Sequence, residues 1–167
     1  SNKSVDVVCF SYYQNNAAGR KPCPYDPKAT AAFMLNASNR ATLRTTAQHF
    51  VRLAAELDKG QPQLIAGAPC THAPEGTGWG AVNAHAGLLW YADALGRLAA
   101  LGVSIYARQT LFGGSYGLLD NSTYMPTPGY WAALLHKRLL GAVVLNATLD
   151  PGASSTLPAD VSVYAHC

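Results

Sequence analysis

Short apolar runs alternate along the chain with longer stretches in which apolar residues recur at helical spacing. Residues 5–10 and 64–67 are apolar almost throughout, and residues 103–109 form a third strand-like run. Runs of this length between turn signals are typical of strands buried on both faces. The pattern therefore predicts three buried strands separated by helical segments.

Helical periodicity marks the segments between these strands. A stripe of apolar residues recurs every three or four positions in residues 41–60 and again in residues 82–102. The stripe residues are Leu43, Ala47, Phe50, Val51, Ala54 and Leu57 in the first segment and Leu88, Tyr91, Leu95 and Leu98 in the second. Gly60 and Gly102 end these two helices, and a further helix is predicted over residues 130–141.

Buried strands that alternate with helices predict an α/β fold with parallel strands. Three such units fit either a small open sheet or part of a (β/α)8 barrel, which needs about 250 residues. In both architectures ligands bind at the carboxyl ends of the strands, here residues 11–16, 67–72 and 108–114. Two more strands are predicted over residues 142–149 and 159–167.

Composition and charge exclude several classes of protein. The 12 basic and 9 acidic residues are spread singly and give a net charge of +3, so there is no basic stripe for nucleic acid. No apolar run approaches the roughly 20 residues of a membrane span. The first ten residues lack the pattern of a signal peptide, and we expect any export signal to have been removed or to lie upstream.

The number of N-glycosylation triplets favours an extracellular location. Four Asn-x-Ser/Thr triplets occur, whereas chance would give about one, although small polar residues also cluster in loops. Four cysteines with only 13% charged residues also suit an oxidising, secreted setting. We therefore expect an extracellular glycoprotein. The predicted glycosylation sites are Asn2, Asn36, Asn121 and Asn146.

A family resemblance rests on residues 106–141. The spacing of Arg108-Gln109, Gly113-Gly114, Tyr116-Gly117-Leu118, Pro126 and Tyr130-Trp131 is distinctive. This stretch resembles the last βα unit of the heparanase group of glycoside hydrolases (family 79), which includes plant heparanase-like β-glucuronidases. The final residues resemble the first strand of the accessory β-sandwich of that group.

The resemblance implies a partial barrel. Residues 1–147 would hold the last three βα units of the (β/α)8 barrel, and residues 148–167 a linker and the first strand of the β-sandwich. The general acid/base glutamate of the family lies on an earlier strand, so the resemblance places it outside this chain.

The resemblance also places Ala68 at the position of the nucleophilic glutamate, which follows a glycine at the end of a strand. A retaining glycosidase needs two carboxyl groups about 5 Å apart, and a methyl group replaces neither. The nearest substitute is Glu75, in a loop that does not favour a fixed carboxylate. At the end of the first strand Phe10-Ser11 stands where the group carries a histidine. The resemblance therefore implies no catalytic residue.

The remaining site residues resemble a platform for a uronic-acid-containing glycan. Gln109 and the backbone at Gly114 and Tyr116 match family positions that contact the uronic-acid carboxylate, and Tyr12 is a further candidate at the first strand end. Glycine amides can approach an anion closely. The same glycines would also be needed simply to turn the chain.

Cysteine and histidine positions favour a disulfide over a metal. Cys23 and Cys70 fall beyond strand ends on one predicted face, and we favour this pair among those possible. Cys9 has no assigned partner, and the family partner of Cys167 lies further along the chain. Cys70 and His72 have no matching second pair at zinc-ligand spacing, so neither a metal nor a cofactor is expected.

For one histidine and two tryptophans we predict structural roles rather than roles in ligand binding. His136 is expected to be a cation near a helix C-terminus, where it would oppose the helix dipole. Trp90 and Trp131 lie inside apolar helices, which favours the core over a sugar-stacking role.

Two functions remain open. The first is a non-catalytic heparanase-like module with a glycan-binding or structural role; the second is part of an active β-glucuronidase completed by sequence or a chain not present here. Three strands of a barrel leave an apolar inner face uncovered. We expect the rest of the polypeptide, a partner chain or copies of this chain in a filament to cover it.

Overall fold

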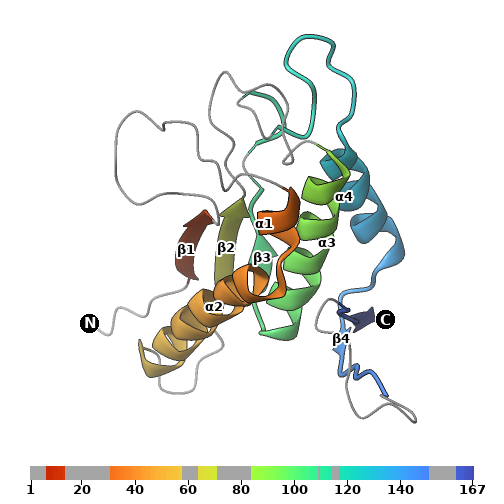
Figure 1. Ribbon diagram of the computed structural model, residues 1–167. Coiled ribbons are helices and arrows are strands. Elements are labelled where there is room, and N and C mark those ends of the chain that lie inside the picture. Colours follow the sequence, from red (N-terminus) through yellow and green to blue (C-terminus); the bar gives the residue numbers. More distant parts are fainter. Residues whose placement is uncertain are drawn as a thin grey trace.

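The structure is a computed structural model that describes residues 7–13, 31–57, 64–70, 84–108, 110–113, 117–150 and 161–167. Its elements are β1 (Val7–Tyr13), α1 (Ala31–Leu35), α2 (Ala37–Leu57), β2 (Leu64–Cys70), α3 (His85–Ala100), β3 (Ile105–Tyr106), α4 (Pro128–Leu139), β4 (Val144–Leu145) and β5 (Ala165–His166). Helices and strands mix as an α/β fold, as predicted (Figure 1). No helix among the described residues is long and apolar enough to cross a bilayer.

The first three strands form one parallel sheet in the order β1-β2-β3. β1 pairs with β2 over all seven of its residues and continues to Tyr13, beyond the predicted end at Phe10. β3 pairs with β2 through Ile105 and Tyr106 alone. The predicted strand over residues 103–109 is therefore wrong in length, because only two of its residues join the ladder.

Helices α2 and α3 cover one face of this sheet, and α1 packs against these two helices (Figure 1). Val8 and Phe10 of β1 point into the helical layer and are buried. The ring of Phe10 stacks on Phe50 of α2 with 5.0 Å between centroids. Aromatic stacking at this distance adds to the free energy gained from apolar burial, so this contact holds α2 on β1.

On the opposite face of the sheet, the described side chains of β1 and β3 are exposed. Side chains alternate along a strand, so Val7, Cys9 and Ser11 face away from α2, and all three are exposed. Ile105 of β3 is 43% exposed. The apolar residues of this face have no cover among the described residues.

The predicted apolar stripes of α2 and α3 form the core. Leu43, Ala47 and Ala54 of α2 are buried, as are Tyr91, Leu95 and Leu98 of α3, and Phe50, Val51 and Leu88 pack partly buried against them. Trp90 is 1% exposed, so its prediction as a core residue is confirmed. Leu57 is an exception at 55% exposed, because α2 ends there.

Backbone signals set the helix ends. Asn36 begins α2: its Oδ1 accepts hydrogen bonds from the N–H groups of Ser38 and Asn39 at 3.0 and 3.3 Å, as expected of a capping asparagine. Gly102 ends α3 with a φ of +83°, a conformation that favours glycine. The helix boundary predicted at Gly102 is thus confirmed.

Helix α4 begins at Pro128, two residues before the predicted start, because proline suits the first turn of a helix. Ala132 is buried, whereas Trp131 is 50% exposed. The prediction of Trp131 as a core residue is therefore wrong: neighbouring helix positions are about 100° apart, and when Ala132 faces inward Trp131 points outward, edge-on to the ring of Tyr130.

The C-terminal strands form a separate two-stranded antiparallel sheet, β4 with β5. Val143 and Cys167 extend it by exchanging two backbone hydrogen bonds of 3.0 Å. This pairing joins residues on both sides of the domain boundary predicted after residue 147.

His136 packs against the second sheet. Its ring lies 5.7 Å from that of His166, nearly perpendicular to it, and the Nδ1 atom of His166 is 3.1 Å from the carbonyl oxygen of Gly141. Burial, followed by the nearby His166, lowers the pKa of His136 below its usual value. This shift disfavours the cationic role expected of His136, because desolvation and a second imidazole favour the neutral ring.

We expect His136 to make folding weaken in mild acid. A histidine whose pKa is lowered in the folded state stabilises the fold fully above its unfolded pKa of about 6.5, and this contribution is lost as the pH falls towards the folded pKa. Urea unfolding between pH 7.5 and 5.5 should show a smaller loss of stability for His136→Gln than for the wild type. His85→Gln, at the exposed start of α3, serves as the control; equal slopes in all three proteins would contradict the assignment.

Candidate functional site

The carboxyl ends of β1, β2 and β3 lie at one edge of the parallel sheet, where ligands bind in such folds. Ala68 of β2 pairs in register with Ser11 of β1. One residue earlier, Gly67 lies between Phe10 and Tyr106. The backbone thus brings the predicted nucleophile position level with the end of the first strand.

Tyr12 is the one glycan-binding candidate with a described side chain. Its hydroxyl hydrogen-bonds with Oγ1 of Thr42 on α2. Thr42 donates its own proton to the carbonyl of Asn39 at 2.6 Å, so Tyr12 is the donor. Burial raises the pKa of Tyr12, and the bond to Thr42 partly opposes that rise. The hydroxyl is therefore committed to α2.

Arg108 supplies a positive charge two residues after the end of β3. Its guanidinium lies 4.8 Å above the centre of the Tyr91 ring, within the range of a cation–π interaction. Tyr91 is 4% exposed and also contacts the ring of Tyr106, 5.2 Å away. Burial raises the pKa of Tyr91, and the charge of Arg108 partly lowers it. Arg108 entered the sequence analysis only as part of a motif, because its contact with α3 depends on the fold.

The loop after β3 folds back on itself. The N–H groups of Leu118 and Leu119 bond to the carbonyls of Thr110 and Leu111 at 3.0 and 2.9 Å. Gly113 takes a φ of +95° and donates its N–H to Oδ1 of Asn121 at 3.0 Å. The predicted glycosylation site Asn121 is exposed and uses its oxygen, not its amide nitrogen, in this bond.

Asp120 stabilises the same loop. Its Oδ1 accepts from the N–H and hydroxyl groups of both Thr123 and Ser122 at 2.6 to 3.0 Å. These hydrogen bonds lower the pKa of Asp120 to about 2. An aspartate that bonds to the residues after it is a turn signal that the sequence does contain.

Several predicted residues lie outside the described part of the chain. These are Asn2, Cys23, Glu75, Gln109, Gly114 and Tyr116, together with His72. Asn36 and Asn146 are exposed. Cys9 and Cys167 are free, exposed thiols. The pairing of Cys23 with Cys70 stays a prediction.

Among the described residues, no group of three His, Cys, Asp or Glu side chains is placed so that it could hold a metal ion. Catalytic carboxylates are also lacking at the described strand ends: residues 11–13, 68–70 and 106–108 include no Asp or Glu.

Asp93 is the centre of a buried cluster of charges. Arg97, one turn later on α3, donates to both carboxylate oxygens at 3.0 to 3.2 Å. Arg40 of α2 lies 3.4 Å from Oδ1, and the hydroxyl of Tyr164, just before β5, donates to Oδ1 at 2.8 Å. The four-residue spacing of Asp93 and Arg97 could have predicted their pair; the other two contacts are long-range.

Comparison with known proteins gives similar sequences over about half of this chain. Heparanase-like protein 1 of Arabidopsis thaliana is 46% identical over 78 residues, which are 47% of this chain and 13% of the relative. Baicalin-beta-D-glucuronidase of Scutellaria baicalensis is 44% identical over 78 residues, 47% of this chain and 14% of the relative. Heparanase of Gallus gallus is 43% identical over 83 residues, 49% of this chain and 15% of the relative.

This chain is related to the heparanase-like proteins. The resemblance inferred from residues 106–141 is thereby confirmed at the level of the family. No protein-family model matches the chain. The matches cover 13 to 15% of the three relatives, so this chain accounts for only a part of such a protein.

We expect Gly96 to be essential for the position of Tyr164. A Cβ atom at Gly96 would overlap the Cγ and Cδ2 atoms of the Tyr164 ring. Gly96→Ala should therefore destabilise the protein by about 1–3 kcal/mol through overpacking. In the Tyr164→Ala background the same change should instead stabilise it by up to about 1 kcal/mol, because alanine favours a helix interior over glycine.

Denaturant unfolding of the wild type, both single variants and the double variant completes the thermodynamic cycle. A Gly96→Ala effect of the same sign and size with and without Tyr164 would contradict the close approach of α3 to this ring.

Proposed function

We propose that this heparanase-like chain belongs to an extracellular glycoprotein that binds a uronic-acid-containing glycan at the strand ends without hydrolysing it. The single observation that carries the proposal is the composition of the described strand ends, where Ala68 and Ser11 lie in register and no carboxylate is present. Family relatives named as heparanase and glucuronidase support a glycan-related role.

Hydrolysis with retention requires a carboxylate that attacks the anomeric carbon and a carboxylic acid that protonates the leaving oxygen. Alanine at position 68 can do neither. Glu75 would have to reach the anomeric carbon from a loop seven residues away, and catalysis tolerates only about 0.5 Å of misplacement. The residue types at this edge therefore favour binding without turnover.

Binding of a uronic-acid carboxylate needs a positive charge and hydrogen-bond donors, and the sequence contains such groups near the end of β3. Arg108 places a fixed positive charge at the end of β3, held by the ring of Tyr91. In the sequence Gln109 follows it directly, and Gly114 and Tyr116 come five and seven residues after Gln109. A guanidinium with nearby amides suits a carboxylate, because charged hydrogen bonds are stronger than neutral ones.

We also propose that the three parallel strands are part of a larger (β/α)8 barrel in residues 1–147, with residues 148–167 beginning a second region. The order β1-β2-β3, in which consecutive strands are neighbours, supports this. Val7, Cys9 and Ile105 are exposed on one face of the sheet. Their exposure supports the proposal that the rest of the polypeptide, a partner chain or another copy of this chain packs against this face.

The alternative is part of an active retaining glucuronidase that acts on uronic-acid-containing glycans. The name of one relative, baicalin-beta-D-glucuronidase, favours it. It would require the acid/base carboxyl group to come from sequence or a chain not present here, and the nucleophile to be Glu75 or to come from that same source.

The first prediction of this proposal is binding without turnover. Purified protein should bind a glucuronic-acid-containing oligosaccharide in calorimetry, yet release no product from an aryl β-glucuronide. Gln109→Ala should weaken binding about tenfold, as the loss of a hydrogen bond to a charged group would. Gln48→Ala, the same substitution on α2, should leave binding unchanged.

Product release that Glu75→Gln abolishes would overturn the proposal in favour of the glucuronidase. If Gln109→Ala and Gln48→Ala weaken glycan binding equally, the glycan binds elsewhere than at the strand ends.

The second prediction concerns secretion. Asn36, Asn121 and Asn146, all exposed, should carry N-glycans in native material, and Asn2 is a further predicted site. Peptide mapping before and after glycosidase treatment tests each site separately. An unmodified Asn121, in an exposed loop, would count against an extracellular location.

A further inference from the structure

The loop between β3 and α4 carries a group of exposed apolar side chains. This loop rises above the edge of the parallel sheet at which the strands end (Figure 1). Its exposed apolar side chains are Leu111, Phe112, Tyr124 and Met125, each between 47 and 64% exposed. Large apolar side chains that gather on a surface commonly mark a place where another group binds.

Phe112 and Tyr124 form a stacked pair within this group. The centroids of their rings are 5.1 Å apart, and the ring planes differ by only 20°. The stacking holds both rings in place while about half or more of each side chain faces water. A pair that is already ordered loses little further conformational freedom when a ligand packs against it.

The backbone of Tyr124 lies in the left-handed region, with a φ of +58°. This conformation costs free energy for a bulky residue, whereas glycine would adopt it without strain. The Tyr124 N–H donates to the carbonyl of Asp120 at 2.9 Å, and the Asp120 N–H donates to the carbonyl of Met125 at 2.9 Å. The turn thus presents a tyrosine ring at a position where glycine would be less strained, which favours a role for that ring.

Asn121, a predicted glycosylation site, belongs to the same turn. Its Oδ1 accepts the N–H of Gly113 at 3.0 Å, so its side chain contacts the residue directly after Phe112. Tyr124 follows three residues later in the chain. An N-glycan is attached to the side-chain nitrogen, so the oxygen can keep this hydrogen bond in the glycosylated protein. A glycan on Asn121 would therefore begin next to the segments that carry both rings.

The chemistry of a sugar suits such a pair of rings. One face of a pyranose ring presents C–H groups, which can pack against an aromatic face and remove apolar surface from water. Its hydroxyl groups lie at the ring edge and can stay hydrated. A bulky glycan on Asn121 would also keep a partner chain away from Phe112 and Tyr124, which favours the attached sugar as the group that covers them.

We propose that Phe112 and Tyr124 form an aromatic platform against which the first N-acetylglucosamine of a glycan on Asn121 packs. The platform fixes the direction in which the glycan leaves the loop, and the sugar covers the exposed rings. This inference rests on the proposed extracellular glycoprotein, and it is independent of glycan binding at the strand ends.

The test is NMR spectroscopy of the secreted protein with each N-glycan trimmed enzymatically to its first sugar. Asn121→Gln identifies the signals of the Asn121 sugar by their loss. These signals should lie upfield of those of free N-acetylglucosaminyl-asparagine, because protons above an aromatic face are shielded. Phe112→Leu and Tyr124→Leu keep an apolar side chain without the ring, and each should reduce the upfield shift. Leu111→Ala, at an equally exposed position without a ring, should leave the shift unchanged.

Mass spectrometry of the peptide that contains Asn121 separates two kinds of failure. An unmodified Asn121 would overturn this inference together with the proposed glycosylation of that site. An occupied Asn121 would overturn the aromatic platform alone if its sugar signals matched those of the free glycosyl-asparagine. The same conclusion would follow if the shift survived in both leucine variants, or if Leu111→Ala reduced it as much as they do.

Discussion

The carboxylate of Asp93 holds the two halves of the described structure together. It accepts hydrogen bonds from Arg97 and Tyr164 and forms an ion pair with Arg40, so it joins α2, α3 and the segment that leads into β5. The side chains of Arg40 and Asp93 are about nine-tenths buried. Removing one member of such a group leaves an uncompensated charge away from water, which costs about 3–5 kcal/mol. The position of the C-terminal segment therefore depends on this single acid.

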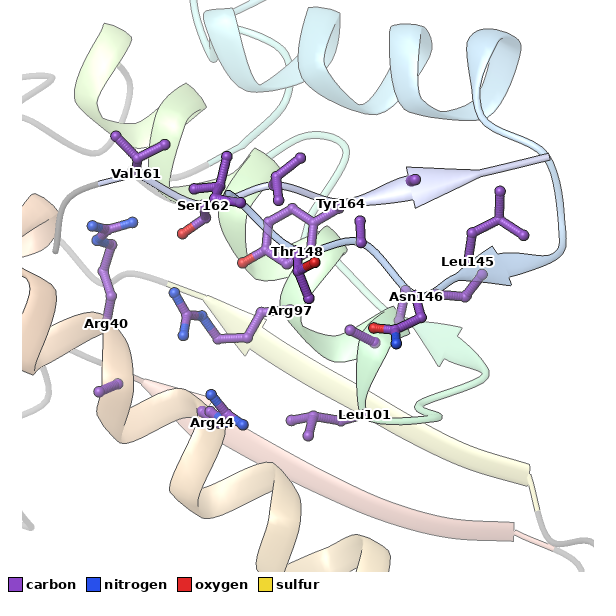
Figure 2. Close-up of a pocket in the computed structure, with 18 of the residues that line it drawn as sticks. Arg40, Arg44, Arg97, Leu101, Leu145, Asn146, Thr148, Val161, Ser162 and Tyr164 are labelled. Atoms are coloured by element: carbon purple, nitrogen blue, oxygen red, sulfur yellow. The ribbon is translucent and has the colours of Figure 1, made fainter. Parts of the chain in front are cut away.

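The dependence extends to the backbone of α3. Tyr164 can reach Asp93 only because Gly96, one turn later on the same helix, leaves room for its ring. Helix interiors disfavour glycine, so this residue trades helix stability for a close contact. With Tyr164 seated there, β5 pairs with β4, and both strands line a pocket together with α2 and α3 (Figure 2).

Local patterns predicted most of the helices and strands, although not their exact ends, and long-range contacts decided how they pack. The apolar stripe of α3 predicted Tyr91, Leu95 and Leu98 in the core because periodicity depends on one helix alone. It could not predict that Trp131 is exposed, since that follows from which side of α4 packs on its neighbour. His136 was assigned a charge from its place at a helix end, but the neighbouring His166 comes from thirty residues later in the chain. The candidate site divides in the same way: motifs identified the strand ends, whereas the partners of Asp93 and the contact of Arg108 with Tyr91 required the fold.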